Sequence, residues 1–416
     1  MRRPDNNMKT KPKLYRISNM KIKLFLLIFL IINALSISAQ TRTLKLTPHK
    51  ISLSSGLTFN LYLPEEFEIM VAAEGLKRAR FMSKSPDGRI FVTDMYNLTD
   101  NKRGAIYILE DFDERTGRFR KVIPYLTQLH NPNSICFHSD QSGQSWIYIA
   151  LTDSLIRYRY RAGDNSPTGR PQVLATFPDY GLNYKYGGWH LTRTLAFGPN
   201  GKLYVAVGSS CNACEEKEEI RATVTEMNMD GTGRRIYAKG LRNAVGIKWV
   251  GSELFATDMG ADHLGDNSPS DTMYVVRDRL NYGWPYCYQL GPRILADPQF
   301  KSSEKNPGCR GMPQAYAAFI AHSSPLGLEY FDSDNNSSAS LRTYFLVALH
   351  GSSDHKLKRG HSIVRVRRGA RIEDFINGFQ QNGMIYGRPA DIMRLGPDAF
   401  LFTDDHRGVV YYVRKR

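Results

Sequence analysis

The chain has 416 residues, of which 42% are hydrophobic, and a formal charge of +16. This length exceeds that of an ordinary single core, but repeat architectures escape the limit because each unit packs only on its neighbours. Residues 1–39 hold eight Lys/Arg and one acid, which leaves about +9 for the rest. The surplus is not gathered in a tail or stripe. It therefore argues against nucleic-acid binding and suits an anionic ligand or a cell-surface polymer.

The first segment has the order of a secretion signal. A basic start at Met20–Lys23 precedes an apolar run from Leu24 to about Leu35 and a small-residue exit at Ser36–Ala39. This order predicts a signal peptide within a leader of residues 1–39. The alternative is a membrane anchor, but the run is shorter than the about 20 residues that a spanning helix needs. We expect a secreted or periplasmic protein without stable membrane insertion, with one domain over residues 40–416.

The five cysteines predict two disulfides in an oxidising compartment. Cys211 and Cys214 form a C-x-x-C, and Cys287 and Cys309 bracket a Gly/Pro-rich loop. Cys136 lies in an apolar run and is expected to be a buried free thiol. The alternative for the C-x-x-C is a metal or redox site, although no second C-x-x-C or neighbouring His completes a zinc set.

One pattern recurs along the chain: a short apolar strand, a turn, and an alternating strand that ends in a small or acidic residue. The six copies are Met82–Asp94, Ile135–Asp153, Leu195–Gly208, Val245–Asp258, Leu326–His350 and Ile392–Asp404. Turns reading Pro-Asp-Gly or Pro-Asn-Gly supply the positive φ of a tight hairpin, and the strands alternate with period two. The repeat predicts an all-β fold, a six-bladed β-propeller, with a pair of β-sandwiches as the alternative.

The expected ring has two further consequences. Strands from Lys45 to Ile69 should pair with Val409–Val413 to close it. The residues that follow each copy should converge around the central channel, although each alone is more often a turn former. These residues are Asp94, Asp153, Ser209/Ser210, Asp258, His350 and Asp404/Asp405.

Candidate functional groups stand next to these copies. His190 follows Gly-Gly-Trp, where imidazole suits a general base, or is simply an exposed loop residue. Arg242 and Asn243 precede the fourth copy, and a guanidinium there suits a carboxylate or a developing oxyanion, or pairs with a neighbouring blade. Arg388 opens the sixth copy, and Lys358 adds charge near the fifth.

The segment 257–271 is dense in carboxylates and loop carbonyls. Ca²⁺ takes six to eight such oxygens. The spacing does not match the EF-hand loop, so an irregular Ca²⁺ site and a solvated acidic loop are both open. The metal candidates are Asp258, Gly260, Ala261 and Asp271.

Taken together, these segments resemble the glucose/sorbosone dehydrogenase family of pyrroloquinoline quinone enzymes, over most of the chain after about Phe67. The resemblance is carried by Thr192–Cys214, Gly240–Gly246, Asp258–Asp271 with Asn281–Cys287, and Ser324–Leu328. It implies a six-bladed propeller that oxidises the hydroxyl of a sugar or polyol. Hydride would pass to pyrroloquinoline quinone, with Ca²⁺ as its partner and an external electron acceptor.

The resemblance also implies roles for single residues. His190 matches the base that removes the hydroxyl proton, Arg242 the residue facing the reacting quinone oxygen, and Asn243 a cofactor contact beside it. The main-chain carbonyls of Gly260 and Ala261 match calcium ligands. Arg388 matches a guanidinium on a cofactor carboxylate, and Lys358 a cofactor-contacting lysine.

Two departures from the family pattern leave other functions open. Thr272 replaces a frequent acid beside the metal loop, and Ser353-Asp354-His355 stands where Trp-Asn-Arg commonly follows. A non-catalytic carbohydrate- or protein-binding propeller is therefore an alternative. A metal-dependent propeller hydrolase such as a lactonase is a third.

Overall fold

The computed structural model describes residues 43–179, 190–333, 337–354 and 356–416. Residues 44–416 form one compact unit. The predicted signal peptide lies outside the described residues. Within those residues, no helix has the length and apolar character that a membrane span requires.

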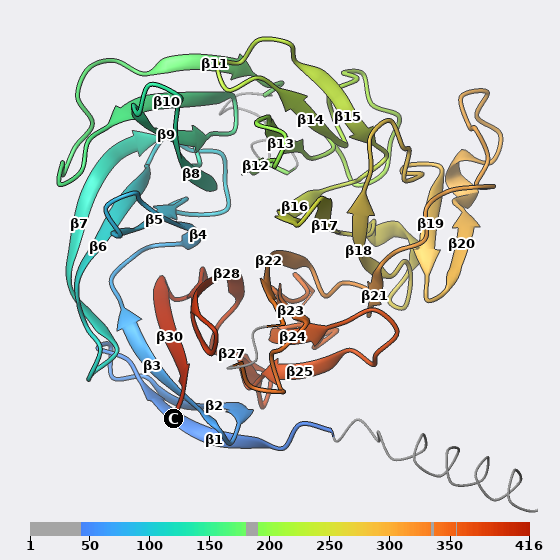
Figure 1. The fold of residues 1–416 in the computed structure, drawn as a ribbon. Helices are drawn as coiled ribbons and strands as arrows, with labels where there is room; N and C mark the ends of the chain where they lie inside the picture. Colours follow the sequence, from blue (N-terminus) through green and yellow to red (C-terminus); the bar gives the residue numbers. More distant parts are fainter. Residues whose placement is uncertain (1–42, 180–189, 334–336, 355) are drawn as a thin grey trace, which may run out of the picture. The chain divides into compact units, whose positions relative to one another are not determined.

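Six four-stranded antiparallel sheets form a ring of blades around a centre, which confirms the predicted β-propeller (Figure 1). Blade 1 consists of β4 (Ala79–Lys84), β5 (Ile90–Asp94), β6 (Gly104–Asp113) and β7 (Arg118–Leu129); blade 2 of β8 (Ser134–Ser139), β9 (Ser145–Ala150), β10 (Ser154–Tyr160) and β11 (Gln172–Thr176); blade 3 of β12 (Arg193–Phe197), β13 (Leu203–Val207), β14 (Thr223–Met227) and β15 (Arg235–Lys239). Blade 4 consists of β16 (Ala244–Val250), β17 (Glu253–Asp258), β18 (Asp271–Val276) and β21 (Ala317–Phe319); blade 5 of β22 (Pro325–Phe331), β23 (Tyr344–Leu349), β24 (Ser362–Val366) and β25 (Glu373–Ile376); blade 6 of β28 (Pro389–Gly396), β29 (Ala399–Asp404), β30 (Val409–Lys415) and β3 (Phe67–Ala73).

Each copy of the sequence repeat forms the first two strands of a blade. The turns that join them close in the predicted way, because a glycine at positive φ completes the loop. Gly88 has φ +87° and donates its N–H to the Ser85 carbonyl (2.9 Å), and Gly201 has φ +69° and donates to the Gly198 carbonyl (3.1 Å). The same local chemistry therefore builds blades 1 and 3.

The ring is closed by β3, which pairs with the C-terminal strand β30 and places Ile69 opposite Val413. The segment predicted to close the ring, from Lys45 to Ile69, was too long, because only β3 pairs with the C-terminal strand. β1 (Leu46–Ser52) and β2 (Thr58–Pro64) pair with each other as a separate hairpin. Packing explains this difference, because the hairpin buries Leu61 in a cluster with Phe375 and Phe379 of blade 5 and the segment after it.

A long insertion in blade 4 lies between β18 and β21. It contains the 3₁₀ turn η2 (Pro298–Phe300) and the hairpin of β19 (Cys287–Leu290) and β20 (Arg293–Ala296), whereas the 3₁₀ turn η1 (Asp262–Leu264) lies in the preceding loop between β17 and β18. A small hairpin of β26 (Gln380–Gln381) and β27 (Met384–Ile385) follows blade 5. Both predicted disulfides, Cys211–Cys214 and Cys287–Cys309, are formed. Cys136 is free as expected, but half-buried rather than buried.

The hydrophobic core is divided among the interfaces between blades. Phe91 of blade 1 meets Phe137 and Tyr160 of blade 2 edge-on, with ring centroids 4.9 and 5.9 Å apart. At the ring centre, Phe81 and Val245 form an apolar cluster with Leu326 and Ala390 on the inner strands of blades 5 and 6.

Threonine hydroxyls tie each of four blades to the next. In every case the threonine precedes the aspartate near the end of the second strand, and its hydroxyl donates to a backbone carbonyl of the following blade. The four pairs are Thr93 to Asn133 (2.8 Å), Thr152 to Leu191 (2.8 Å), Thr257 to Leu326 (2.7 Å) and Thr403 to Arg80 (2.7 Å). The Thr-Asp ending of the repeat therefore has a structural origin.

Candidate active site

A cavity of about 520 Å³ opens among the loops of blades 1, 3, 4, 5 and 6. Its volume falls in the range of about 300–1,000 Å³ that is typical of small-molecule sites. The predicted site residues that line it are His190, Arg242, Asn243, Gly260, Asp271 and Arg388. The sequence therefore located most of the groups that meet here.

Three arginines of the cavity wall occupy one repeated position. Each stands 16 residues before the aspartate that ends the second strand of its blade, and each donates its backbone N–H to that carboxylate. The pairs are Arg78 with Asp94 (2.9 Å), Arg242 with Asp258 (3.1 Å) and Arg388 with Asp404 (2.8 Å). The aspartates thus fix the backbone from which the guanidinium groups project.

Both carboxylate oxygens of Asp258 accept backbone N–H groups. Its second oxygen accepts the backbone N–H of Asn243 (2.6 Å). Burial raises the pKa of Asp258 to about 7. Asp258 and Ala261 line a small neighbouring cavity instead of the central one. Metal binding by these two residues stays a prediction.

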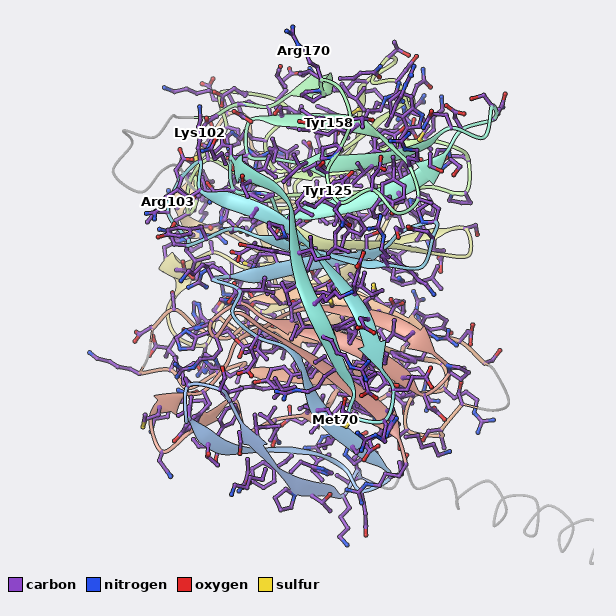
Figure 2. All side chains as sticks on the ribbon, turned by 90° about the vertical axis from the view of Figure 1, so that its left-hand side faces the viewer. Met70, Lys102, Arg103, Tyr125, Tyr158 and Arg170 are labelled. Atoms are coloured by element: carbon purple, nitrogen blue, oxygen red, sulfur yellow. A yellow bond between two sulfur atoms is a disulfide. The ribbon has the colours of Figure 1, made fainter. Side chains whose placement is uncertain are left out.

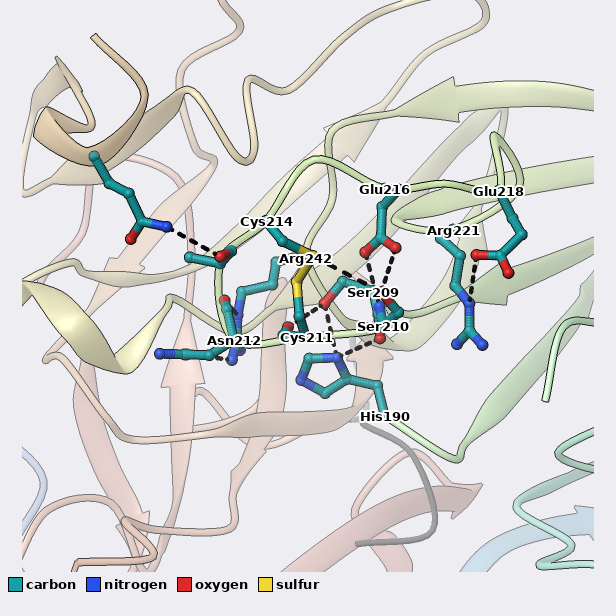
Figure 3. The surroundings of a disulfide bond; sticks show 12 residues. His190, Ser209, Ser210, Cys211, Asn212, Cys214, Glu216, Glu218, Arg221 and Arg242 are labelled. Carbon is teal, nitrogen blue, oxygen red and sulfur yellow. Dashed lines mark hydrogen bonds and ion pairs between the residues drawn. A yellow bond between two sulfur atoms is a disulfide. The ribbon is translucent and has the colours of Figure 1, made fainter. Parts of the chain in front are cut away.

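His190 is held in one tautomer by Ser209 (Figure 3). The imidazole Nδ1 lies 2.9 Å from both the carbonyl and the hydroxyl oxygen of Ser209, and that hydroxyl donates in turn to the Cys211 carbonyl (2.8 Å). Both Ser209 oxygens therefore accept, so Nδ1 carries the hydrogen and Nε2 is the basic nitrogen. Burial, followed by the positive charge of Arg242, lowers the pKa of His190 well below its ordinary value, which keeps the ring neutral at pH 7.

Arg242 is held by the disulfide loop. Asn212, between Cys211 and Cys214, accepts from the guanidinium through its carbonyl (2.8 Å from Nε) and its side-chain oxygen (2.9 Å from Nη2) (Figure 3). The Met259 carbonyl lies 3.4 Å from Nη1. The sequence predicted the disulfide but gave no signal that Asn212 would accept hydrogen bonds from Arg242. All three acceptors are neutral.

Arg388 has the same kind of surroundings. Its guanidinium donates to the backbone carbonyls of Gly351 and Ser352 (2.9 Å each) and of His350 (3.2 Å). Arg242 and Arg388 are only 4% and 9% exposed. Among the described residues, no carboxylate lies within ion-pair distance of either guanidinium.

Asp405 is the ion-pair partner of two other arginines of the cavity wall. Its carboxylate lies 2.8 Å from Arg80 Nη1, 3.1 Å from Arg78 Nη1 and 2.8 Å from His350 Nε2. Burial alone would raise the pKa of Asp405, but His350, Arg80 and Arg78 hold it far below its usual range. Sequence reasoning placed Asp405 and His350 at the channel but missed both arginines. The 16-residue spacing is a signal that would have found Arg78.

The remaining predicted residues separate into two groups. Asp271 bridges two blades, because its carboxylate accepts the backbone N–H of Gly260 and of Ser324 (2.7 Å each), and burial raises its pKa to about 6. Lys358 lines a different cavity, of about 640 Å³. The structure therefore does not bring Lys358 to the other candidates. Asp262, which the sequence did not single out, lines the central cavity.

A family model described as TrAA12-like matches residues 61–376. The chain belongs to the TrAA12-like family. The holo PQQ domain of pyranose dehydrogenase from Coprinopsis cinerea superposes with a TM-score of 0.68 at 17% identity, covering 86% of this chain and 97% of that one. The calcium structure of the Trichoderma reesei carbohydrate-active enzyme of family AA12 gives 0.69 at 16% identity, covering 90% and 100%. An uncharacterized protein of Borreliella burgdorferi is 24% identical over 376 residues, 86% of this chain and 91% of that protein.

The TrAA12-like chain has the fold of quinoprotein sugar oxidoreductases, in agreement with the resemblance that its motifs indicated. The two departures from the motif pattern fall at different depths. Ser353 lines the central cavity. Thr272 is buried in β18, and its hydroxyl lies 3.5 Å from the Asp258 carbonyl. The first departure therefore faces the central cavity, and the second lies within blade 4 beside Asp258.

Proposed function

We propose that this TrAA12-like chain is a secreted or periplasmic dehydrogenase that oxidises a hydroxyl of a sugar or polyol, with pyrroloquinoline quinone as hydride acceptor and Ca²⁺ beside it. The observation that carries the proposal is the state of Arg242 and Arg388. Both cations are buried at the wall of one cavity, and among the described residues their guanidinium groups donate to neutral oxygens and have no direct ion-pair partner. A buried cation without a directly bonded carboxylate favours an anionic ligand, so the site suits a multiply charged anion such as a tricarboxylate quinone.

The similar structures support the same chemistry. One is described as the holo form of a PQQ domain of a pyranose dehydrogenase, and the other as a calcium structure. In this chain, Arg242, Asn243 and Arg388 would hold the cofactor. The carbonyls of Gly260 and Ala261 would bind Ca²⁺.

The side chains of the site then have separate tasks. When bound, the quinone supplies a two-electron acceptor for hydride. His190 removes the proton of the substrate hydroxyl at Nε2, because Ser209 keeps the hydrogen of the ring on Nδ1. Arg242 would stabilise negative charge on a bound acceptor, and its own charge adds to burial in lowering the pKa of His190. Asp258 positions Arg242 and Asn243 through their backbone N–H groups.

The experiment is dye reduction with a panel of aldoses, using protein loaded with pyrroloquinoline quinone and Ca²⁺. His190→Gln should lower kcat by about 10²–10⁴-fold, the usual contribution of a general base, without weakening cofactor binding. His49→Gln, on the β1–β2 hairpin, is the matched control. The acid limb of kcat/KM should lie below pH 6.5, because the pKa of His190 is lowered. Unchanged turnover by His190→Gln would show that another group is the base.

A further inference from the structure

A second cavity, of about 640 Å³, lies where blade 4 meets blade 5. Its lining comes from the end of β21 in blade 4, from β24 and β25 in blade 5, from β2, and from residues 377–381. The volume is within the range of about 300–1,000 Å³ that small-molecule sites have. Of the predicted site residues only Lys358 lines it, so its chemistry is separate from that of the central cavity.

The charged groups at this second cavity do not require a charged ligand. The cations of Lys358 and Arg359 remain open to water, as does the carboxylate of Asp374. Glu373 is paired with the guanidinium of Arg365 (3.0 Å). Charges that water already solvates gain little from an ion pair. The second cavity therefore differs from the central one, where buried guanidinium groups have no ion-pair partner among the described residues.

Neutral polar side chains of the second cavity lack partners within the protein. The Tyr62 hydroxyl and the side-chain amide of Gln380 make no hydrogen bond in the part of the chain that the structure describes. Gln381 donates its amide nitrogen to the carbonyls of Asn60 (2.7 Å) and Gly378 (2.6 Å), which leaves its Oε1 as an acceptor. Amide and phenol groups both donate and accept. These side chains therefore suit a ligand whose own groups do the same.

Tyr62 and Ile320 add apolar surface to this polar lining. Ile320, which follows β21, is 57% exposed. The Tyr62 ring is held in place, because a Cβ on Gly378 would lie only 3.0 Å from the ring atom Cδ2. The backbone of Tyr62 also exchanges two hydrogen bonds with Asn377 (3.0 Å each). A ring that is ordered before a ligand arrives loses little entropy on binding, so Tyr62 is prepared for contact with a ligand.

His361 lies between the second cavity, which it lines, and Gly351, which lines the central one. The ring packs directly on Gly351, because a Cβ on that glycine would lie 2.4 Å from three ring atoms. The Gly351 carbonyl in turn accepts from Arg388 (2.9 Å). Burial lowers the pKa of His361 to about 3, and its buried Nδ1 has no hydrogen-bond partner among the described residues. Such an atom commonly marks a missing water or ligand hydroxyl.

We propose that the second cavity binds a neutral saccharide of the size of a disaccharide, which Tyr62, Gln380 and Gln381 contact. A sugar ring has C–H faces and a periphery of hydroxyl groups that each donate and accept, as the amide and phenol groups of this cavity do. Because only His361 and Gly351 separate the two cavities, the bound unit would be a distal part of a sugar chain whose end is oxidised. This last step rests on the proposed function, whereas saccharide binding itself does not.

The test is isothermal titration of full-length, quinone-free protein with maltose, cellobiose, lactose and sucrose. The wild type should bind at least one of these disaccharides at millimolar concentration. Tyr62→Ala should weaken that binding at least tenfold, because it removes the ring and the hydroxyl together. Gln380→Ala should weaken it about 2–10-fold, the usual effect of one lost hydrogen bond. Tyr158→Ala, a half-buried strand tyrosine on the side of the ring that Figure 2 shows, is the matched control and should bind as the wild type does.

Gln380 is half-buried and its side chain bonds to no described residue, so its substitution tests the site without a folding defect. His190→Gln should bind the disaccharide as the wild type does, which separates this cavity from the central one. No binding of any of the four disaccharides by the wild type would overturn the proposal. Affinities unchanged in both Tyr62→Ala and Gln380→Ala would also overturn it, because the sugar would then bind elsewhere, and tighter binding of digalacturonate would refute the neutral class. The titration contains no quinone, so its outcome is independent of the dye-reduction test.

Discussion

Gly208→Ala places a single methyl group between two residues of the proposed site. A Cβ at Gly208 would lie 2.6 Å from the His190 Cβ and 2.5 Å from the Asn243 Oδ1. Carbon atoms in contact are normally about 3.5–4.0 Å apart, so His190 must retreat by roughly 1 Å. A misplacement of this size costs about 10²-fold in rate, equivalent to about 2.7 kcal/mol of the barrier.

The assay is kcat/KM for the best aldose in the dye-reduction test, together with urea unfolding. We expect the loss in rate with a stability cost of about 1–3 kcal/mol, the usual effect of overpacking. Gly396→Ala is the matched control, because its nearest neighbour would be 4.0 Å away. A Gly208→Ala enzyme with wild-type kcat/KM would refute the idea that close packing sets the position of His190.

Two further substitutions probe the supports of the cavity. Asp405→Asn removes the partner of Arg80 and should cost about 3–5 kcal/mol in urea unfolding at pH 7. Because the pKa of Asp405 is lower in the folded than in the unfolded protein, this stabilisation is present above about pH 4 and is lost as the pH falls. A stability difference between the wild type and Asp405→Asn that grows toward pH 3 would contradict the assignment. Replacing Cys211 and Cys214 together by Ser should cost only about 2 kcal/mol of stability, because the disulfide closes a short loop. The replacement should nevertheless weaken quinone binding, because Asn212 is no longer fixed. Unchanged affinity in a quinone titration would show that the disulfide does not support the site.

The inner hairpins of the blades were predictable from sequence because their signals are local. Period-two alternation and a glycine at positive φ define Met82–Asp94 and Leu195–Gly208 without reference to the rest of the chain. Ring closure was less accurate. Pairing of β3 with β30 joins segments more than 300 residues apart, and both β2 and β3 have suitable apolar alternation. What distinguishes β2 from β3 is the packing of Leu61 against blade 5, a tertiary contact that local sequence does not reveal.

The candidate site shows the same division. His190, Arg242 and Arg388 could be found because they stand beside copies of a repeat. The roles of the carboxylates could not, since the sequence does not tell whether an aspartate faces a metal or a backbone N–H. Asp258 illustrates this point, because its carboxylate is occupied by backbone N–H groups. Lys358 lay close to the fifth copy in sequence but at another cavity in space.

The most direct test of the account is a titration of apo-protein with pyrroloquinoline quinone in the presence of Ca²⁺, followed by absorbance. The account predicts saturable binding of one equivalent. It also predicts that Arg242→Met and Arg388→Met each weaken the binding at least tenfold, because each removes a buried cation that has no ion-pair partner among the described residues. No binding at micromolar quinone, or affinities unchanged in both variants, would contradict the claim that these arginines form an anionic cofactor site.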